Sequence, residues 1–177
     1  MTEFQPSAHT MTIALGVDYG QAYLLDDYDE TDIPERLGQD DEGQPLGVIS
    51  VMEGAALLTI GTHYGKVRFD VQVTPFEPDP DLDAYEDIVE IGFTSATGSV
   101  SLHEWGDEEI YALPPLPSGP GQYRLRYHVP GLDESHCDYY EEQAPDRYLL
   151  QIWPSGDSAA RVVKSASRRH RRWMRAD

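Results

Sequence analysis

The chain has 177 residues, 40% of them hydrophobic, which suits one domain with a substantial buried core. Its formal charge of −19 is unevenly distributed: residues 1–160 carry 31 acidic and 6 basic side chains, whereas residues 161–177 carry 1 acidic and 7 basic. No apolar run reaches the roughly 18 residues of a membrane-spanning helix, and the acidic body would be repelled by nucleic acid and by anionic lipid. The charge of the body therefore favours basic proteins as partners.

Short apolar–polar alternations recur along the chain and predict β-strands with one buried face. The nine predicted strands cover residues 12–16, 21–25, 54–61, 67–73, 87–93, 99–105, 109–113, 122–129 and 147–153. Between them, residues 96–98 predict a tight hairpin and residues 114–121 a Pro/Gly corner. The pattern predicts an all-β fold, an antiparallel β-sandwich resembling a jelly roll, with a basic helix at the C-terminus.

The basic segment at the C-terminus differs in pattern from the rest. In residues 158–174 an apolar stripe at helical spacing consists of Val162, Val163, Ala166, His170 and Trp173. We therefore expect an N-terminal tail at 1–9, a β-sandwich domain at 10–155 and a basic helix or tail at 156–177. The helix is expected to pack on the domain and neutralise its acidic side chains, with nucleic-acid binding by the tail as the alternative.

The cysteine content and the N-terminus bear on location. Cys137 is the single cysteine and cannot form an internal disulfide. Residues 1–16 contain no Lys or Arg and no apolar run long enough for a signal peptide. We therefore expect a cytoplasmic protein.

Residues 75–90 carry seven carboxylates and no basic side chain. Five of them match the ligand spacing of a calcium-binding EF-hand loop: Asp79, Asp81, Asp83, Asp87 and Glu90. The sixth position of such a loop needs Gly for its sharp turn, and the residue there is Ala84. A calcium- or carbohydrate-binding β domain is therefore the alternative function, and metal binding stays open.

The preferred interpretation of this segment is a surface for a basic partner. Further acidic segments lie at 26–43, 104–109 and 133–142, and tyrosines are interleaved with the acidic residues at Tyr28, Tyr85, Tyr139 and Tyr140. Carboxylates on such a surface can occupy the positions that phosphates take in the basic cleft of a nuclease. The predicted partner contacts are Asp79, Asp81, Asp83, Glu86 and Asp87, with Tyr85 as an aromatic anchor. Solubility alone is the other explanation for so many acidic side chains.

No residue pattern indicates an enzyme. The segment at 61–66 is one residue short of a phosphate-binding loop, and a zinc or thiol site at His136 and Cys137 lacks a second pair of ligands. His63, His103 and His128 are scattered over separate elements. We therefore expect a binding protein without catalytic residues and without a cofactor.

Residues 119–154 resemble a small bacterial family, the ComJ inhibitors of the DNA-entry nuclease of competence systems. The shared features are a strand that begins with Gly121, Tyr123 and Leu125, an acidic loop, and a strand with an aromatic residue followed by aliphatic ones at 148–152. Residues 61–79 are similar to the middle strands of that family, so the resemblance covers about half the chain. It implies a cytoplasmic β-sandwich that inhibits a nuclease by binding it. The acidic segment at 26–43 and the basic tail have no counterpart in the family.

The charge distribution and the resemblance to the ComJ family predict the same function. We expect an acidic inhibitor or immunity protein that binds a basic nuclease or nuclease toxin.

Overall fold

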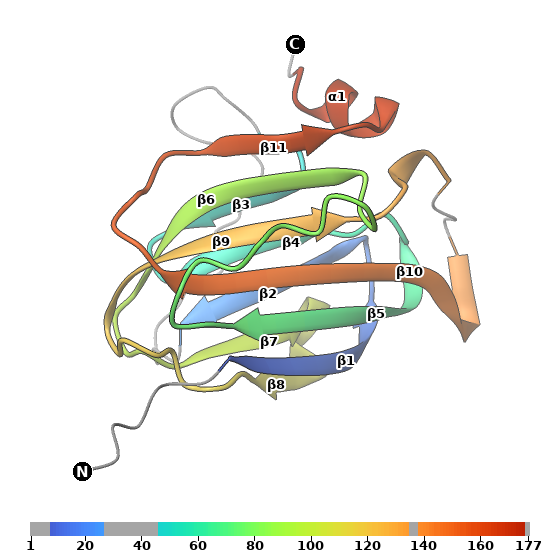
Figure 1. The fold of residues 1–177 in the computed structure, drawn as a ribbon. Coiled ribbons are helices and arrows are strands. Elements are labelled where there is room, and N and C mark those ends of the chain that lie inside the picture. The colour runs from blue at the N-terminus through green and yellow to red at the C-terminus, as the bar shows by residue number, and fades with distance from the viewer. Residues whose placement is uncertain (1–7, 27–45, 135–137, 176–177) are drawn as a thin grey trace.

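The computed structural model describes residues 8–26, 46–134 and 138–175, with the backbone alone for 138–144, and these residues form a β-sandwich (Figure 1). In the described residues, one sheet has six strands in the order β1 (His9–Val17), β5 (Tyr64–Val73), β10 (Asp138–Pro154), β9 (Gly121–Val129), β6 (Asp87–Ser95) and β11 (Arg161–Ser165). The other has five, in the order β3 (Ile49–Met52), β4 (Ala55–Thr59), β2 (Gln21–Asp26), β7 (Val100–Glu104) and β8 (Ile110–Ala112). The all-β prediction is confirmed.

The core lies between the two sheets. Phe69, Tyr127 and Tyr148, from three adjacent strands of the six-stranded sheet, are fully buried, with their ring centroids 6.1 to 6.3 Å apart. The core also contains the fully buried Leu24, Leu58 and Leu102 of β2, β4 and β7. The Tyr127 hydroxyl donates to the Thr59 carbonyl at 2.9 Å, so a polar bond also joins the sheets. Alternating apolar residues on both sheets thus supply the buried area that holds the sandwich together.

Each of the nine predicted strands has a counterpart, although three details differ from the expectation. Strand β10 pairs antiparallel with β9 but parallel with β5, so the six-stranded sheet is mixed. The hairpin predicted at 96–98 is wrong, because β6 and β7, which flank it, belong to different sheets. The corner at 114–121 is confirmed as a connection between the sheets, from β8 to β9. Strand β3 was not predicted.

The C-terminal segment is a strand followed by a short helix. Residues 161–165, predicted to be helical, form β11 and pair antiparallel with β6. The β-branched Val162 and Val163 favour a strand, and the edge of β6 offers them unpaired backbone groups. Helix α1 covers Arg168–Trp173, and its N-terminus is capped by the Ser167 hydroxyl, which accepts the His170 N–H at 3.0 Å. Residues 161–165 therefore belong to the six-stranded sheet, and the basic helix α1 follows them.

Two short 3-10 turns complete the described elements, η1 (Trp105–Asp107) and η2 (Leu132–Glu134). Within the described ranges, no helix combines the length and apolar content that a membrane crossing requires.

Candidate functional site

Residues 75–86, which we call the acidic loop, connect β5 to β6 and cross the outer face of the six-stranded sheet (Figure 1). Three hydrogen bonds fix the main chain of this loop to side chains of β9 and β10. The Pro78 carbonyl accepts from Arg126, the Asp79 carbonyl accepts from Gln151 at 3.1 Å, and the Asp81 N–H donates to Nε2 of His128 at 3.1 Å. The loop is therefore a covering layer on the sheet, held by its backbone.

The polar residues of β9 face outward, as its alternation predicted, yet they are not exposed. Arg124 and Arg126 are each 2% exposed and His128 is 0% exposed. The acidic loop covers Arg126 and His128, so buried polar groups of the sheet become anchors for the loop. Sequence alternation identified the outer face but gave no sign that a loop covers it.

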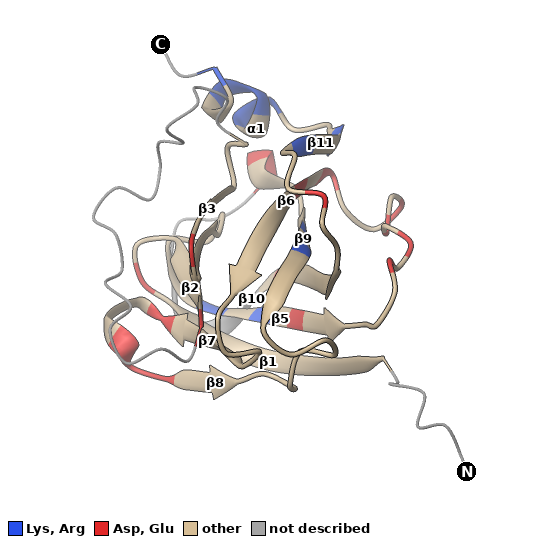
Figure 2. Ribbon diagram, turned by 90° about the vertical axis from the view of Figure 1, so that its left-hand side faces the viewer, with Lys and Arg blue, Asp and Glu red and all other residues tan. Residues whose placement is uncertain are grey.

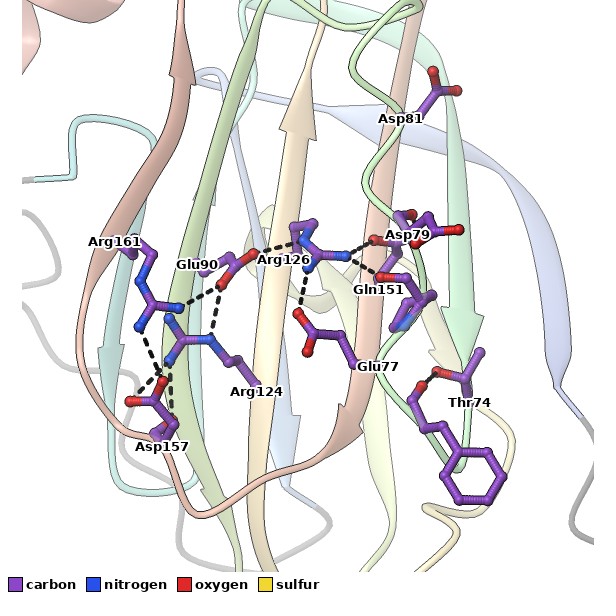
Figure 3. Close-up of polar contacts among 12 residues, drawn as sticks. Thr74, Glu77, Asp79, Asp81, Glu90, Arg124, Arg126, Gln151, Asp157 and Arg161 are labelled. Carbon is purple, nitrogen blue, oxygen red and sulfur yellow. Dashed lines mark hydrogen bonds and ion pairs between the residues drawn. The ribbon is translucent and has the colours of Figure 1, made fainter.

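A buried charge network, made of Glu90, Arg124 and Arg126, lies between the loop and the β10–β11 connection (Figure 3). Oε1 of Glu90 accepts from Nε of Arg126 at 2.7 Å, and Oε2 accepts from Nε of Arg124 at 2.9 Å. Burial alone would raise the pKa of Glu90, but the hydrogen bonds from Arg126 and Arg124 outweigh it and hold that pKa below its usual range. Removing one member of such a buried set leaves the others uncompensated, at a cost of about 3–5 kcal/mol.

The network continues to the acidic loop and to β11. Nη2 of Arg126 pairs with the loop residue Glu77 at 2.9 Å, and its guanidinium carbon lies 4.7 Å from the centre of the Trp153 ring. On the other side, Arg161 of β11 pairs with Glu90 at 3.4 Å and with Asp157 at 3.1 Å. One buried carboxylate therefore joins the loop, the sheet and the C-terminal strand.

The predicted partner contacts divide into two groups. Asp79, Asp83 and Glu86 are exposed, and Asp81 is partly buried, with Oδ1 accepting the Ala84 N–H at 3.0 Å. These four carboxylates lie on the outer surface of the loop or at its margin. Their contact with a partner stays a prediction.

Tyr85 and Asp87 lie in the interior, with exposed fractions of 2% and 0%, so the prediction that they contact a partner is wrong. The ring of Tyr85 packs edge-on against that of His128, with centroids 5.1 Å apart. The carboxylate of Asp87 accepts the N–H groups of Ala166 and Ser167 at 2.9 and 3.1 Å and the hydroxyl of Ser167 at 2.5 Å. Both residues hold the loop and the C-terminal segment in place instead.

The pKa of Asp87 reflects this position. Burial would raise it, but bonds from His170 and Ser167 lower it below its usual range, and Nδ1 of His170 lies 3.3 Å from Oδ1. Asp87 and Glu90 are thus committed to Ser167 and to the two arginines, so the calcium-loop interpretation of residues 79–90 is wrong. Within the described part of the chain, no three His, Cys, Asp or Glu side chains are grouped so that they could hold a metal ion.

The other acidic segments are described in part. In residues 104–109, the side chains of Asp107, Glu108 and Glu109 are exposed. Asp133 accepts the N–H groups of Arg168 and Arg169 at 2.8 and 2.9 Å at the start of α1. Several residues considered in the sequence lie outside the described residues or side chains. They are the segment 27–43 with Tyr28, the side chains of Tyr139 and Tyr140, and the pair His136 and Cys137 that was considered as a zinc or thiol site.

The three histidines that the sequence left unplaced do not converge. His128 is buried under the acidic loop, His103 contacts Asp107 at 2.8 Å through Nδ1, and His63 lies against the ring of Tyr64 with centroids 4.3 Å apart. In the segment 61–66, residues 61–63 lie in the connection from β4 to β5, and residues 64–66 begin β5.

The basic side chains gather at one end of the molecule, as they do in the sequence. Figure 2 shows Lys and Arg concentrated on β11 and α1, whereas Asp and Glu are distributed over the loops of the remaining body. Lys164 of β11 reaches the acidic loop and donates to the Leu82 and Tyr85 carbonyls at 2.6 and 2.7 Å. The acidic loop, fixed on its sheet and to β11, is the candidate site for a basic partner.

No family model and no curated protein matches this sequence. Two solved structures share the fold. The structure of ComJ from Bacillus subtilis, inhibitor of the DNA-degrading activity of NucA, matches with a TM-score of 0.60 at 15% identity, over 85% of this chain and 100% of that chain. The protein of crocagin biosynthetic gene J matches with a TM-score of 0.54 at 14% identity, over 85% of this chain and 99% of that one. The resemblance to ComJ is confirmed, and it is a resemblance of fold.

Proposed function

We propose that this protein is an inhibitor that binds a basic nuclease or nuclease toxin and acts without catalysis of its own. The observation that carries the proposal is the acidic loop, whose exposed carboxylates Asp79, Asp83 and Glu86 stand on a main chain fixed to a rigid sheet. The fold shared with ComJ, which inhibits the nuclease NucA, supports it. The proposal includes a cytoplasmic location, which rests on the sequence alone.

The physical argument concerns the cost of binding. A loop that is already ordered loses little conformational entropy when a partner binds, so more of the interaction energy appears as affinity. Exposed carboxylates at fixed positions steer a basic partner from a distance and then form charge-assisted hydrogen bonds with Arg and Lys side chains. Such steering acts chiefly on the association rate and weakens as salt shortens the Debye length from about 10 Å at 0.1 M.

The test is a pull-down from the native host followed by identification of the captured proteins and an assay of DNA cleavage. We expect wild-type protein to capture a basic nuclease and to inhibit it. Replacing Asp79, Asp83 and Glu86 by Lys should slow association by about tenfold or more at low salt without unfolding the protein, because exposed carboxylates contribute little to stability.

The control is Glu53→Lys, which reverses one exposed carboxylate in the turn between β3 and β4, compared with Asp83→Lys in the loop. The two changes alter the net charge equally, so a larger effect of Asp83→Lys assigns the contact to the loop. Capture of no basic protein, or inhibition that is indifferent both to salt and to the triple Lys change, would leave the carboxylates as aids to solubility.

A further inference from the structure

Four aromatic side chains form a cluster at three turns that meet at one end of the sandwich. The members of this ring cluster are Tyr19 in the β1–β2 turn, His63 and Tyr64 at the start of β5, and Trp105 in η1. The ring of Tyr19 is central: its centroid lies 4.8 Å from that of Trp105, 5.4 Å from Tyr64 and 6.0 Å from His63.

The ring cluster is open to solvent. Tyr19 is 52% exposed and Trp105 is 40% exposed, while His63 is exposed and Tyr64 is partly buried. Large aromatic side chains normally gain stability by burial, and contiguous exposed ones mark sites of interaction. The buried Tyr85 cannot anchor a partner. Among the described residues, Phe76 of the acidic loop is an isolated exposed ring at 79%, whereas the ring cluster offers several exposed rings in contact with one another.

The backbone that carries Tyr19 is strained and firmly held. Its φ is +57°, in the left-handed region that a Tyr seldom adopts, and the following Gly20 has a φ of +64°. A left-handed conformation costs a residue with a Cβ about 1–2 kcal/mol, a cost that Gly or Asn reduces. The Gly20 N–H donates to the His63 carbonyl at 3.0 Å, and the Gly20 carbonyl accepts the Ile60 N–H at 2.8 Å. The turn therefore presents the ring of Tyr19 in a fixed position.

Acidic side chains flank the rings in sequence. Asp18 precedes Tyr19, and the exposed Asp107, Glu108 and Glu109 follow Trp105. The turn that holds them is closed by the Glu104 N–H, which donates to the Glu109 carbonyl at 3.0 Å, and by the contact of Asp107 with His103. An aromatic centre with a carboxylate rim matches the composition of a protein–protein hot spot that receives Arg side chains.

We propose that the ring cluster is the aromatic anchor of the interface with the basic partner, and that it receives Arg or Lys side chains of that partner between its rings and its carboxylate rim. This inference rests on the proposed function and adds a second contact surface to the acidic loop. A guanidinium is attracted to the face of a Tyr or Trp ring within about 6 Å of its centre and can pair with a neighbouring carboxylate at the same time. The rings are inclined to one another by 56° to 87°, so they form no flat platform on which a sugar ring would stack.

The experiment uses the basic nuclease captured from the native host as its probe, with the full-length protein carrying Tyr19→Asn or Trp105→Ala. Asn tolerates a positive φ, so the first change keeps the turn. Met52→Ala, which trims an exposed apolar side chain of β3 that is 42% exposed, is the matched control. Each aromatic change should weaken binding by about 30-fold, mainly through faster dissociation, and the control should leave it unchanged.

A second readout is independent of the partner. Tyr19→Asn should raise the melting temperature by about a few degrees, because it relieves the left-handed strain, while it weakens binding. Inhibition by the wild type together with equal affinity of the aromatic variants would overturn the ring cluster as the anchor and leave the proposed function standing. Failure of the wild type to bind any basic nuclease would overturn both, and binding of oligosaccharides by the wild type that the Trp105→Ala change abolishes would assign the rings to a sugar.

Discussion

His128 should make the stability of the protein depend on pH through the hydrogen bond that it accepts from the acidic loop. Its ring is fully buried, and Nε2 must be unprotonated to accept the Asp81 N–H. Burial lowers the pKa of His128 from 6.5 to about 4 in the folded protein. The unfolded chain therefore binds a proton that the folded chain excludes, so stability is complete above about pH 6.5 and is lost as the pH falls toward 4.

The size of this effect follows from the two pKa values. One excess proton in the unfolded state gives a slope of about 1.4 kcal/mol per pH unit, so this histidine alone should lower the free energy of unfolding by about 2 kcal/mol between pH 7 and pH 5. Asp87 and Glu90 also destabilise the fold on acidification, because their folded pKa values are lowered, but their contribution is lost below this window. The window from pH 7 to pH 5 therefore separates the effect of His128 from that of these two carboxylates.

Urea unfolding of the wild type and of His128→Gln at several pH values measures the effect. Gln can accept the Asp81 N–H through its side-chain oxygen and does not titrate. The free energy of unfolding of the variant should therefore lack the decrease of about 2 kcal/mol between pH 7 and pH 5, whatever its stability at pH 7. His63→Gln, a change at an exposed histidine, should keep the wild-type slope. Equal slopes for the wild type and His128→Gln would refute the assignment of the buried, neutral ring.

Two further predictions concern the buried carboxylate of Asp87 and the close packing at Gly98. Asp87→Asn should lower the free energy of unfolding by about 2–4 kcal/mol, because an amide cannot accept all the hydrogen bonds from Ser167 and Ala166. The control Asp83→Asn, on the surface, should change the free energy of unfolding by less than about 0.5 kcal/mol. Urea titration of both variants measures the difference. Gly98→Ala should cost about 2 kcal/mol or more in thermal unfolding, since φ is +77° and the new Cβ would lie 2.7 Å from the carbonyl carbon of Gly119. Gly106→Ala, where φ is +70° with nothing within 4 Å, should cost only about 1 kcal/mol, and equal losses would contradict the steric argument.

The fold could be predicted to the extent that one side of each strand is apolar. The alternation of apolar and polar residues in 67–73 and 122–129 predicted β5 and β9 correctly. This period of two is the same whether the polar face of a strand contacts water or other parts of the protein. For the same reason, alternation could not predict the layer that covers the sheet. It predicts that Arg126 and His128 face solvent, whereas both are buried because the acidic loop lies over them. Residues 161–165 were misassigned because a run of five residues fits a helix or a strand equally well until its pairing partner is known.

The sequence predicted the negative charge of the candidate site but not the contacts that its residues make with the rest of the protein. A cluster of carboxylates in sequence indicated the loop, yet the buried positions of Tyr85 and Asp87 depend on β9, on β11 and on Ser167, which are distant in the chain. The ring cluster left no sequence signal, because Tyr19 and Trp105 come from segments 86 residues apart and meet only once the sheets have formed.

The attachment of the acidic loop makes the path of its main chain largely independent of its exposed side chains. Beside Asp79 and Asp83 the sheet holds it through the carbonyls of Pro78, Asp79 and Leu82 and the N–H of Asp81, groups that almost any amino acid would supply, while the side chains of Glu77 and Tyr85 hold its two ends. Substitutions at Asp79 or Asp83 can therefore alter the charge that the surface presents while the path of the chain stays the same. The charge pattern of this surface can therefore change during evolution by exchange of loop side chains, with little cost to the scaffold beneath them.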